Sequence, residues 1–586
     1  MGGFCGFARM IATGLYRVKV KAAGASCSKK ISPSKMPIKT IMRRKYLLCL
    51  VPLVLGACFY YQTLEDAHIT YRYSLHLAQG DKLGAWNTGG EPVEGFSSML
   101  WMLLLSAAAK AHFNIIHASK MLGLISYMLL VFVPLYVGQV IADRKECAIG
   151  GLNPRAFDFT AAALAFYLPM AWYATSGMEA VPFALLVGLV FFWPFIAESA
   201  AVLGVLGGLI VLMRPEGILI AVLAFGCHAL VRWRNAKSIR APLAGLGSAV
   251  VAFVVLTVFR LWYFGYPAPN TYYAKAAGGL LNLEAGAIYV AGFVGAAAAV
   301  FTCILSGCMV NFRRIAEKPF LLFALFLTAL YMLYCIKVGG DPASAFPLWR
   351  HFVHLAPIWL FALGAVCASV FEKDLPAIIV LGFVLLITDF NMGWQQNGFA
   401  AKQFITNVRG LHFFQIEPPN PYFTWLDQLA DGQALISTSL AGKIPYYVRG
   451  NFIDADGLND AHIAHFGTVD PNGPVDSRSD MNYVLSLKPD IIEGYFSGLD
   501  LRNGKTRGEL IGFRAKMSNE MLDNPSFRSE YEFVVNAPYQ DLDRVIFVRK
   551  SFLEKRGRPP GLEVIPVAQT SLYQDHGAQP AGPTSR

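Results

Sequence analysis

The sequence predicts a polytopic α-helical membrane protein with a C-terminal mixed α/β soluble domain. Hydrophobic residues make up 55% of the 586-residue chain and the mean hydropathy is +0.44, which is far too apolar for a soluble protein. Apolar runs of membrane length recur as far as residue 391. From residue 393 onward, polar sequence rich in Pro, Asn, Asp and Gly replaces them.

The formal net charge of +11 comes from one segment of the chain. Residues 1–45 contain eleven Lys or Arg and no acidic residue, which leaves 39 basic and 39 acidic residues in the remainder. A positive tail directly before an apolar run orients that run with the tail in the cytoplasm. We therefore expect a basic cytoplasmic tail and no nucleic-acid partner.

Twelve apolar runs are candidate membrane spans, and the charges between them indicate how many cross. The basic clusters within 144–155, 232–237 and 313–318 should all be cytoplasmic. With residue 1 in the cytoplasm, this requires one early run not to cross. The run 98–112 is short for a span, so we predict an interfacial or re-entrant helix there. About eleven transmembrane helices remain.

The domain organisation follows from this topology, which puts the C-terminus outside. We expect a basic tail at 1–45, a transmembrane domain at 46–392 with a first external loop at 64–97, an external α/β domain at 393–560 and a disordered tail at 561–586. Strand-like runs in the external domain lie at 433–438, 490–492, 531–535 and 544–548.

Two adjacent carboxylates, Glu65 and Asp66, follow the first apolar run. Like charges held side by side at a membrane surface perturb each other's pKa, so such a pair indicates proton handling or ligand binding. The alternative is a solvated helix that begins with acidic residues at its positive end.

The predicted topology brings further polar segments to the same external side. They are 91–98, 176–179, 214–217, 269–275, 339–341 and 350–351. Basic side chains are disfavoured on this side, so Arg214, Lys275 and Arg350 need a reason to be there. An anionic ligand at the outer membrane surface would supply one.

A lipid-linked sugar phosphate would fit such a site. Transfer of its sugar to a hydroxyl needs a carboxylate to accept the hydroxyl proton and cations to hold the departing phosphate. Both kinds of group are present in the external segments. An external compartment lacks nucleotide sugars, so a donor carried by the membrane is the natural one.

These segments resemble the GT-C fold polyprenyl-phosphate-dependent glycosyltransferases. More narrowly, the chain is similar to the terminal arabinofuranosyltransferase family of the mycobacterial cell wall and its relatives in other bacteria. The resemblance runs from about residue 46 to 550 and is carried by the segments 65–73, 93–97, 176–180, 214–217, 269–275, 339–341 and 457–460. The chain departs from the family at Glu65, where the family has Asp.

The resemblance implies a donor, an acceptor and a location. The donor would be decaprenyl-phosphate arabinofuranose, and the acceptor a cell-envelope glycan or glycoprotein at the periplasmic face of the bacterial inner membrane. Nothing in the residue spacing separates arabinose from mannose or another sugar. The sequence requires no cofactor and leaves a divalent metal open.

Roles can be assigned to the donor-binding candidates. Asp66, with Glu65 as its partner, would be the general base of a displacement that inverts the anomeric centre. Lys275 and Arg350 would neutralise the lipid phosphate, helped by Arg214 and His351. The alternative for the cations is interfacial snorkelling of long side chains.

A second group of side chains could bind the sugar or the acceptor. Its members are Asn270, Tyr272, Tyr273, Glu94, Glu179, Asp341 and Arg72. Tyr is also an ordinary residue of membrane interfaces, and carboxylates also cap helices or pair with cations. The same applies to Glu216, a further candidate carboxylate.

Three other classes of protein stay open. A lipid-linked oligosaccharide ligase would use similar chemistry with a pyrophosphate donor and often a metal. A transporter should show paired repeats and charges near the middle of its spans, whereas the charges here lie mainly at span ends. A receptor or assembly subunit with an external sensing domain could share the topology but would not need the acidic pair.

Overall fold

A computed structural model describes residues 44–143, 153–196, 198–275, 279–312, 318–341, 348–394, 399–469, 478–495, 515–535, 544–557 and 563–573. Nearly all of the basic tail predicted at 1–45 lies outside these residues, as does most of the tail predicted to be disordered at 561–586. The prediction of disorder is wrong for residues 563–569, which form a strand and a short helix.

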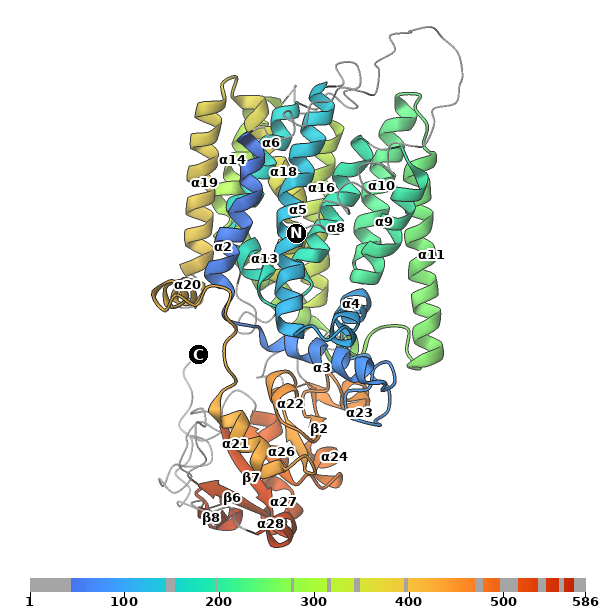
Figure 1. Cartoon of the computed structure of the whole chain (residues 1–586). Helices are drawn as coiled ribbons and strands as arrows, with labels where there is room; N and C mark the ends of the chain where they lie inside the picture. Colours follow the sequence, from blue (N-terminus) through green and yellow to red (C-terminus); the bar gives the residue numbers. More distant parts are fainter. Residues whose placement is uncertain are drawn as a thin grey trace. The chain divides into compact units, whose positions relative to one another are not determined.

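In the described residues as far as Arg409, the regular secondary structure is helical, apart from one isolated β-bridge between Ala85 and Pro92 (Figure 1). Five described helices are long and apolar enough to cross a membrane: α5 (Ile115–Asp143), α10 (Gly217–Arg234), α11 (Arg240–Tyr263), α16 (Pro319–Val338) and α19 (Asp374–Trp394). A bent pair, α13 (Leu280–Ala296) and α14 (Ala298–Val310), adds a sixth if it forms one span broken by 73°.

Shorter helices complete this part of the chain. The apolar ones are η2 (Arg44–Leu50) with α2 (Val51–Phe59), α4 (Met99–Lys110), α6 (Pro154–Phe166), α7 (Leu168–Ala174), α8 (Ala180–Phe192) with η3 (Trp193–Phe195), α9 (Ala200–Met213) and α18 (Ala356–Val370). The more polar ones are α3 (Glu65–Gln79), α12 (Asn270–Lys275), α17 (Arg350–His354) and α20 (Phe399–Arg409). The predicted helical membrane class is confirmed, while the count of eleven spans stays a prediction.

The ends of several helices place polar residues where helix packing stops. Helix α3 begins with Glu65 and Asp66 in its first turn, where the helix dipole favours negative charge. Helix α16 ends at Val338 and is capped by Gly339, whose φ of 90° belongs to the left-handed region that glycine tolerates, and the chain turns there toward Asp341. Helix α9 ends at Arg214, directly before a proline.

Helix α4 corresponds to the run predicted to be interfacial. It has 12 residues and packs against α3, α5 and α9. A helix of 12 residues rises about 18 Å, well short of the roughly 30 Å of a bilayer's hydrocarbon core. Its position in a membrane stays a prediction.

The C-terminal part is a mixed α/β domain, as predicted. A six-stranded sheet has the order β2-β1-β5-β7-β6-β8, in which β1 pairs in parallel with β2 and β5 and the other pairs are antiparallel. Its strands are β1 (Leu435–Thr438), β2 (Asn451–Asp454), β5 (Ile491–Tyr495), β6 (Tyr531–Val535), β7 (Arg544–Arg549) and β8 (Glu563–Pro566). The four predicted strands are confirmed as β1, β5, β6 and β7.

Helices and a small second sheet complete this domain. The helices are α21 (Pro421–Ala430), α22 (Lys443–Tyr447), α23 (Ala461–Phe466), α24 (Met481–Ser486), α26 (Ala515–Asp523), α27 (Pro525–Glu530), α28 (Lys550–Arg556) and η5 (Val567–Gln569). The second sheet pairs β3 (Thr468–Val469) with β4 (Arg478–Ser479).

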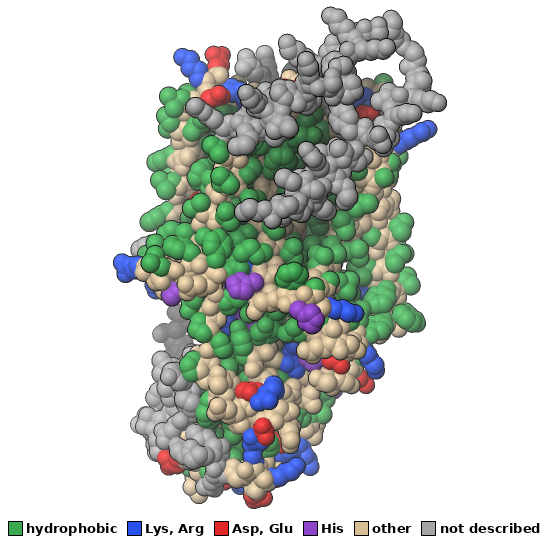
Figure 2. All heavy atoms as spheres, in the orientation of Figure 1, with side chains coloured by type: hydrophobic (Ala, Val, Ile, Leu, Met, Phe, Trp, Pro, Cys, Tyr) green, Lys and Arg blue, Asp and Glu red, His purple; other side chains and the backbone are tan. Residues whose placement is uncertain are grey.

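The exposed side chains of the helical part differ in polarity from those of the α/β domain. On the face shown in Figure 2, hydrophobic side chains cover the region of the long helices, and charged side chains gather over the α/β domain. Val251, Val255 and Val258 of α11 are each about 60% exposed, at 62%, 61% and 59%. Apolar exposure on this scale is typical of a lipid-facing helix.

Candidate active site

A polar cavity of about 240 Å³ lies where the ends of several helices and their loops meet. The candidates from the sequence that line it are Asp66, Glu179, Arg214, Tyr272, Lys275, Asp341, Arg350 and His351. Other polar residues of the lining, absent from the predicted donor and acceptor sets, are Thr70, Ser97, Ser98, Glu216, Thr271 and Tyr334. One cavity therefore gathers polar residues from segments more than 280 positions apart.

Arg350 joins two carboxylates of the cavity. Its Nε and Nη2 donate to Asp341 at 2.9 and 2.6 Å, and its Nη1 lies 3.8 Å from the carboxylate of Asp66. Burial would raise the pKa of Asp341, but Arg350, His351 and Lys275 hold it well below its usual range. Asp341 is therefore a permanently charged anchor for Arg350, while the side chain of Asp66 is 26% exposed and reachable from the cavity.

A second buried cation, Arg214, lies between two glutamates. Its Nε donates to Glu216 at 2.5 Å, and its Nη1 donates to Glu179. Burial disfavours a charged carboxyl group, yet Arg214 and His351 hold the pKa of Glu216 below its usual value. Arg214 therefore bridges two carboxyl groups, and its charge favours the ionised form of Glu216.

The lining holds more acidic than basic side chains. Its carboxylates are Asp66, Glu179, Glu216 and Asp341, and its Arg and Lys side chains are Arg214, Lys275 and Arg350. Burial lowers the pKa of His351 to about 4, so its imidazole is neutral near pH 7. The described lining therefore has one more carboxyl group than it has Arg and Lys side chains.

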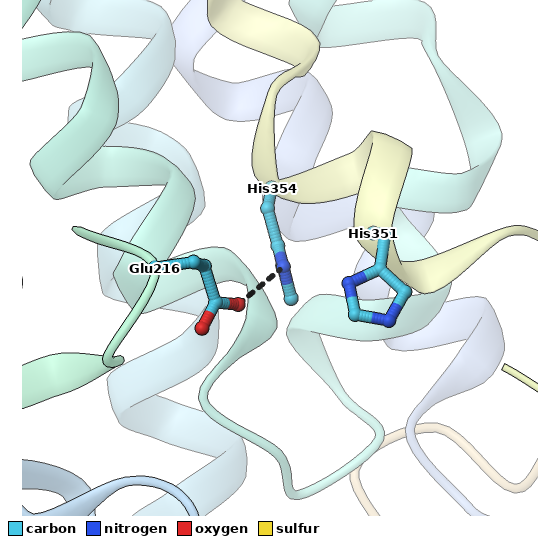
Figure 3. A group of neighbouring side chains, drawn as sticks. All are labelled: Glu216, His351 and His354. Atoms are coloured by element: carbon cyan, nitrogen blue, oxygen red, sulfur yellow. Dashed lines mark ion pairs between the residues drawn. The ribbon is translucent and has the colours of Figure 1, made fainter. Parts of the chain in front are cut away.

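Two histidines lie next to Glu216. Nδ1 of His354 is 3.8 Å from Oε1 of Glu216, and the ligand atoms of Glu216, His351 and His354 all lie within 4.8 Å of one another (Figure 3). This trio is the group in the described part of the chain that could hold a metal ion. Sequence reasoning missed His354 because it lies within an apolar run.

Glu65 lies outside the cavity lining and contacts the α/β domain. Its Oε1 accepts hydrogen bonds from the backbone N–H groups of Gly442 and Lys443, at 3.0 and 2.7 Å. The two carboxylates of the acidic pair therefore have different surroundings. Asp66 faces the cavity, and Glu65 binds the start of α22.

Asn270 and Tyr273 also lie outside the lining, although their neighbours Thr271 and Tyr272 belong to it. Nδ2 of Asn270 donates to the carbonyl oxygens of Gly457 and Leu458, at 2.9 and 3.0 Å. The ring of Tyr273 packs on His465, with ring centres 4.3 Å apart.

Through these contacts the loop after β2 becomes part of the site. Leu458 lines the polar cavity. The next residue, Asn459, accepts a hydrogen bond from the hydroxyl of Tyr73 at 3.0 Å, and Asn270 donates to the backbone carbonyl of Gly457. The α/β domain therefore supplies one piece of the cavity wall.

Glu94 and Arg72 are held in buried contacts outside the lining. Glu94 pairs with Arg260, whose Nε and Nη2 both donate to it at 2.8 Å. Arg72 donates to three carbonyl oxygens, those of Trp86 at 2.6 Å, Gly450 at 3.2 Å and Pro445. These contacts favour a structural role for both residues, because their polar groups are occupied by the protein itself, and their predicted role in sugar or acceptor binding stays a prediction.

Lys120 is a buried cation that sequence reasoning missed. Its ammonium group donates to the carbonyl oxygens of Tyr60, Gln62 and Thr175, at 2.6, 2.6 and 2.9 Å. These carbonyls belong to the segments that lead into α3 and into the turn at 176–179. Lys120 thus holds the backbone behind Asp66 and Glu179.

A second cavity, of about 740 Å³, has an apolar lining drawn from α2, α6, α7, α19 and α20. Leu348 belongs to this lining, and Arg350, two residues later, belongs to the polar one. Two residues of extended chain span at most about 7 Å. An apolar space and a cationic site are therefore neighbours along the chain.

Comparison with known proteins finds likeness at low identity. A family model described as a domain of unknown function, DUF8728, matches residues 414–547. No curated protein matches the chain. The crystal structure of ArnT from Cupriavidus metallidurans bound to undecaprenyl phosphate is similar with a TM-score of 0.49, 13% identity, and coverage of 86% of this chain and 97% of that one.

A second likeness is to the archaeal oligosaccharyltransferase AglB from Archaeoglobus fulgidus, in complex with an inhibitory peptide and a dolichol-phosphate. Its TM-score is 0.45, its identity 10%, and the match covers 89% of this chain and 76% of that one. At such values the likenesses leave donor, acceptor and reaction to be inferred from the residues of the site.

Proposed function

We propose that the protein is a GT-C type glycosyltransferase that moves one sugar from a polyprenyl-phosphate donor to a hydroxyl acceptor outside the cytoplasm. The observation that carries this proposal is the shared cavity of Asp66, Arg350 and Lys275. A reachable carboxylate and two cations are the groups that such a transfer needs.

The reaction is a single displacement. Asp66 accepts the proton of the acceptor hydroxyl as its oxygen attacks the anomeric carbon from the face opposite the phosphate. The bond from that carbon to the phosphate oxygen breaks, and the polyprenyl phosphate leaves with the bonding electrons. Arg350 and Lys275 stabilise the charge that grows on the phosphate, and the anomeric configuration inverts.

The dimensions of the site favour a small head group on a long lipid. A polar cavity of about 240 Å³ is below the usual range of drug-sized pockets, about 300–1,000 Å³, and suits one sugar phosphate better than an oligosaccharide pyrophosphate. The neighbouring apolar cavity gives the isoprenoid chain a place beside the phosphate. Both features favour a monosaccharide transferase over the ligase alternative.

The resemblance of the sequence motifs supplies the finer assignments. The sugar is D-arabinofuranose from decaprenyl-phosphate arabinofuranose, and the acceptor is a cell-envelope glycan or glycoprotein. The protein acts in the bacterial inner membrane, with the cavity and the α/β domain on the periplasmic side.

A donor panel tests this function. The full-length protein in detergent is given synthetic polyprenyl monophosphates that carry arabinofuranose or mannose, and one polyprenyl pyrophosphate, each with glycan and peptide acceptors. Mass spectrometry detects the product and NMR its anomeric configuration. We expect transfer with inversion from the arabinofuranosyl monophosphate. Turnover of the pyrophosphate alone would favour the ligase, and neither binding nor turnover of any donor would refute the proposal.

A further inference from the structure

Glu216, His351 and His354 converge on one point from two separate segments. Glu216 comes from the turn between α9 and α10, and both histidines come from α17. Figure 3 shows the ring of His354 between the carboxylate of Glu216 and the ring of His351. With all three ligand atoms within 4.8 Å of one another, small side-chain rotations bring them to the spacing around one ion.

The two histidines have buried nitrogens without hydrogen bonds. Nδ1 of His351 and both ring nitrogens of His354 have no hydrogen-bond partner among the described residues. The side chain of His354 is fully buried and that of His351 is 7% exposed. Buried polar atoms are normally satisfied, and each neutral imidazole has one ring nitrogen with a lone pair, so each ring can offer one nitrogen to a ligand that accepts that lone pair. A metal ion is such a ligand.

The donor set and its surroundings fit a transition metal. Two imidazoles and one carboxylate are the protein ligands of many zinc sites that keep an open position. Nε2 of His351 lies 3.6 Å from Asp341, so Nδ1 of the same ring can bind the metal while Asp341 orients the ring from behind. All-oxygen ions such as Mg²⁺ and Ca²⁺ are disfavoured by the two nitrogens.

The charges of the site can accommodate this ion. Arg214 binds Glu216 on one side, but Glu179 shares that guanidinium, and a carboxylate has further lone pairs for a metal. The described lining has four carboxylates against three Arg and Lys side chains. With a divalent ion bound, the formal charge of the lining side chains and the ion together changes from −1 to +1.

We propose that Glu216, His351 and His354 bind a divalent transition-metal ion, of which Zn²⁺ fits the donor set best. Glu216 and His351 line the polar cavity and His354 closes the site from behind, so the ion's open position faces the cavity. The ion would there coordinate a phosphate oxygen of the donor, an extension that rests on the proposed function.

Metal binding is tested directly. The full-length protein in detergent is stripped with a chelator, equilibrated with Zn²⁺ and desalted, and its metal content is measured by mass spectrometry. Co²⁺ loading adds a visible absorption spectrum that reports the ligands. We expect about one ion per chain, and a loss of affinity of tenfold or more in Glu216→Gln and in His354→Gln. A metal-free wild-type protein after this treatment would overturn the site.

His68→Gln is the matched control. His68 is another buried histidine with an unbonded Nε2, but it lies on α3 outside the trio. This variant should retain the ion, and equal loss in all three variants would overturn the assignment. His351→Gln replaces either test variant that does not fold, as judged by thermal unfolding.

A measurement with added lipid donor distinguishes failure of this inference from failure of the proposed function. Addition of a polyprenyl monophosphate should change the Co²⁺ spectrum of the wild type, because a phosphate oxygen enters the open position. Turnover of the donor while the Co²⁺ spectrum stays unchanged is a different result. That result would overturn coordination of the phosphate by the ion, but it would leave the metal site and the proposed function intact. A bound ion in a protein that neither binds nor turns over any donor would refute only the proposed function.

Discussion

Arg350 donates two hydrogen bonds to the buried carboxylate of Asp341, and its remaining nitrogen lies 3.8 Å from the reachable carboxylate of Asp66. Two guanidinium nitrogens are thus held by Asp341, and the third faces Asp66, the proposed general base. A single point charge could not fill both positions.

Arg350→Lys should therefore reduce catalysis although it keeps the positive charge. The lysine would lose one of the two bonds to Asp341 and reach the donor phosphate with a less defined position. We expect kcat to fall by about 10²-fold, as for the loss of one preorganised donor, with a rise in KM for the lipid donor. Steady-state kinetics measure both. Arg449→Lys, at an exposed pair with Asp427, is the control and should leave both unchanged.

The acidic pair should divide into a catalytic and a structural member. Asp66→Asn should lower kcat by about 10²-fold or more, the range for loss of a general base, without lowering the unfolding temperature. Glu65→Gln should lower the unfolding temperature and retain most of kcat, because it weakens the contact with Gly442 and Lys443. Steady-state kinetics and thermal unfolding of both variants test this division. If Glu65→Gln loses kcat while Asp66→Asn loses only stability, the two roles are exchanged.

Glu94 and Arg260 should behave as a buried structural pair. Glu94→Gln leaves the charge of Arg260 buried without its partner, which costs about 3–5 kcal/mol of stability. The double variant Glu94→Leu with Arg260→Met removes both charges and should recover much of that loss. Chemical denaturation measures the stability, and donor KM should match the wild type in the double variant. A folded double variant that no longer binds donor would assign Glu94 to the site.

Stability of the α/β domain should depend on pH through Asp454. Burial, together with the nearby carboxylate of Asp456, raises the pKa of Asp454 to about 7 from an ordinary value of 3.8. Between pH 4 and 7 the folded chain keeps a proton that the unfolded chain has lost, so stability falls as pH rises through this window. The unfolding temperature should be lower at pH 8 than at pH 5.

Asp456→Asn should flatten this dependence, because it removes the charge that opposes ionisation of Asp454. The gain in unfolding temperature should appear at pH 8 and shrink at pH 5. Asp431→Asn, at an exposed position paired with Arg556, serves as the control and should leave the slope unchanged. If the unfolding temperature of Asp456→Asn depends on pH as steeply as that of the wild type, Asp454 is not the cause of the pH dependence.

Much of the fold could be predicted from the sequence because helices and strands depend on patterns of neighbouring residues. Apolar run length predicts helices in a membrane protein, and short strand-like runs in the polar C-terminal sequence predict the strands of the α/β domain. The break between α13 and α14 was not predicted, because the apolar run continues across it without a proline. Strand order was not predictable either, since pairing joins residues as distant as Ile436 and Ile491.

The composition of the cavity was partly predictable for a similar reason. The positive-inside rule singles out Arg214, Lys275 and Arg350 as cations on the disfavoured side, and all three line the cavity. The rule says nothing about partners. It could not show that Arg72 binds backbone carbonyls, nor that His354, inside an apolar run, would stand beside Glu216.

The insertion of Leu458 into the cavity wall limits how this protein can be recombined. A chimera that exchanges the segment 414–547 for that of another protein would also replace the loop gripped by Tyr73 and Asn270. The incoming loop would meet two hydrogen-bond donors positioned for the side chain of Asn459 and the carbonyl oxygen of Gly457. A graft of a foreign α/β domain therefore requires matching residues at positions 73 and 270, far outside the domain itself.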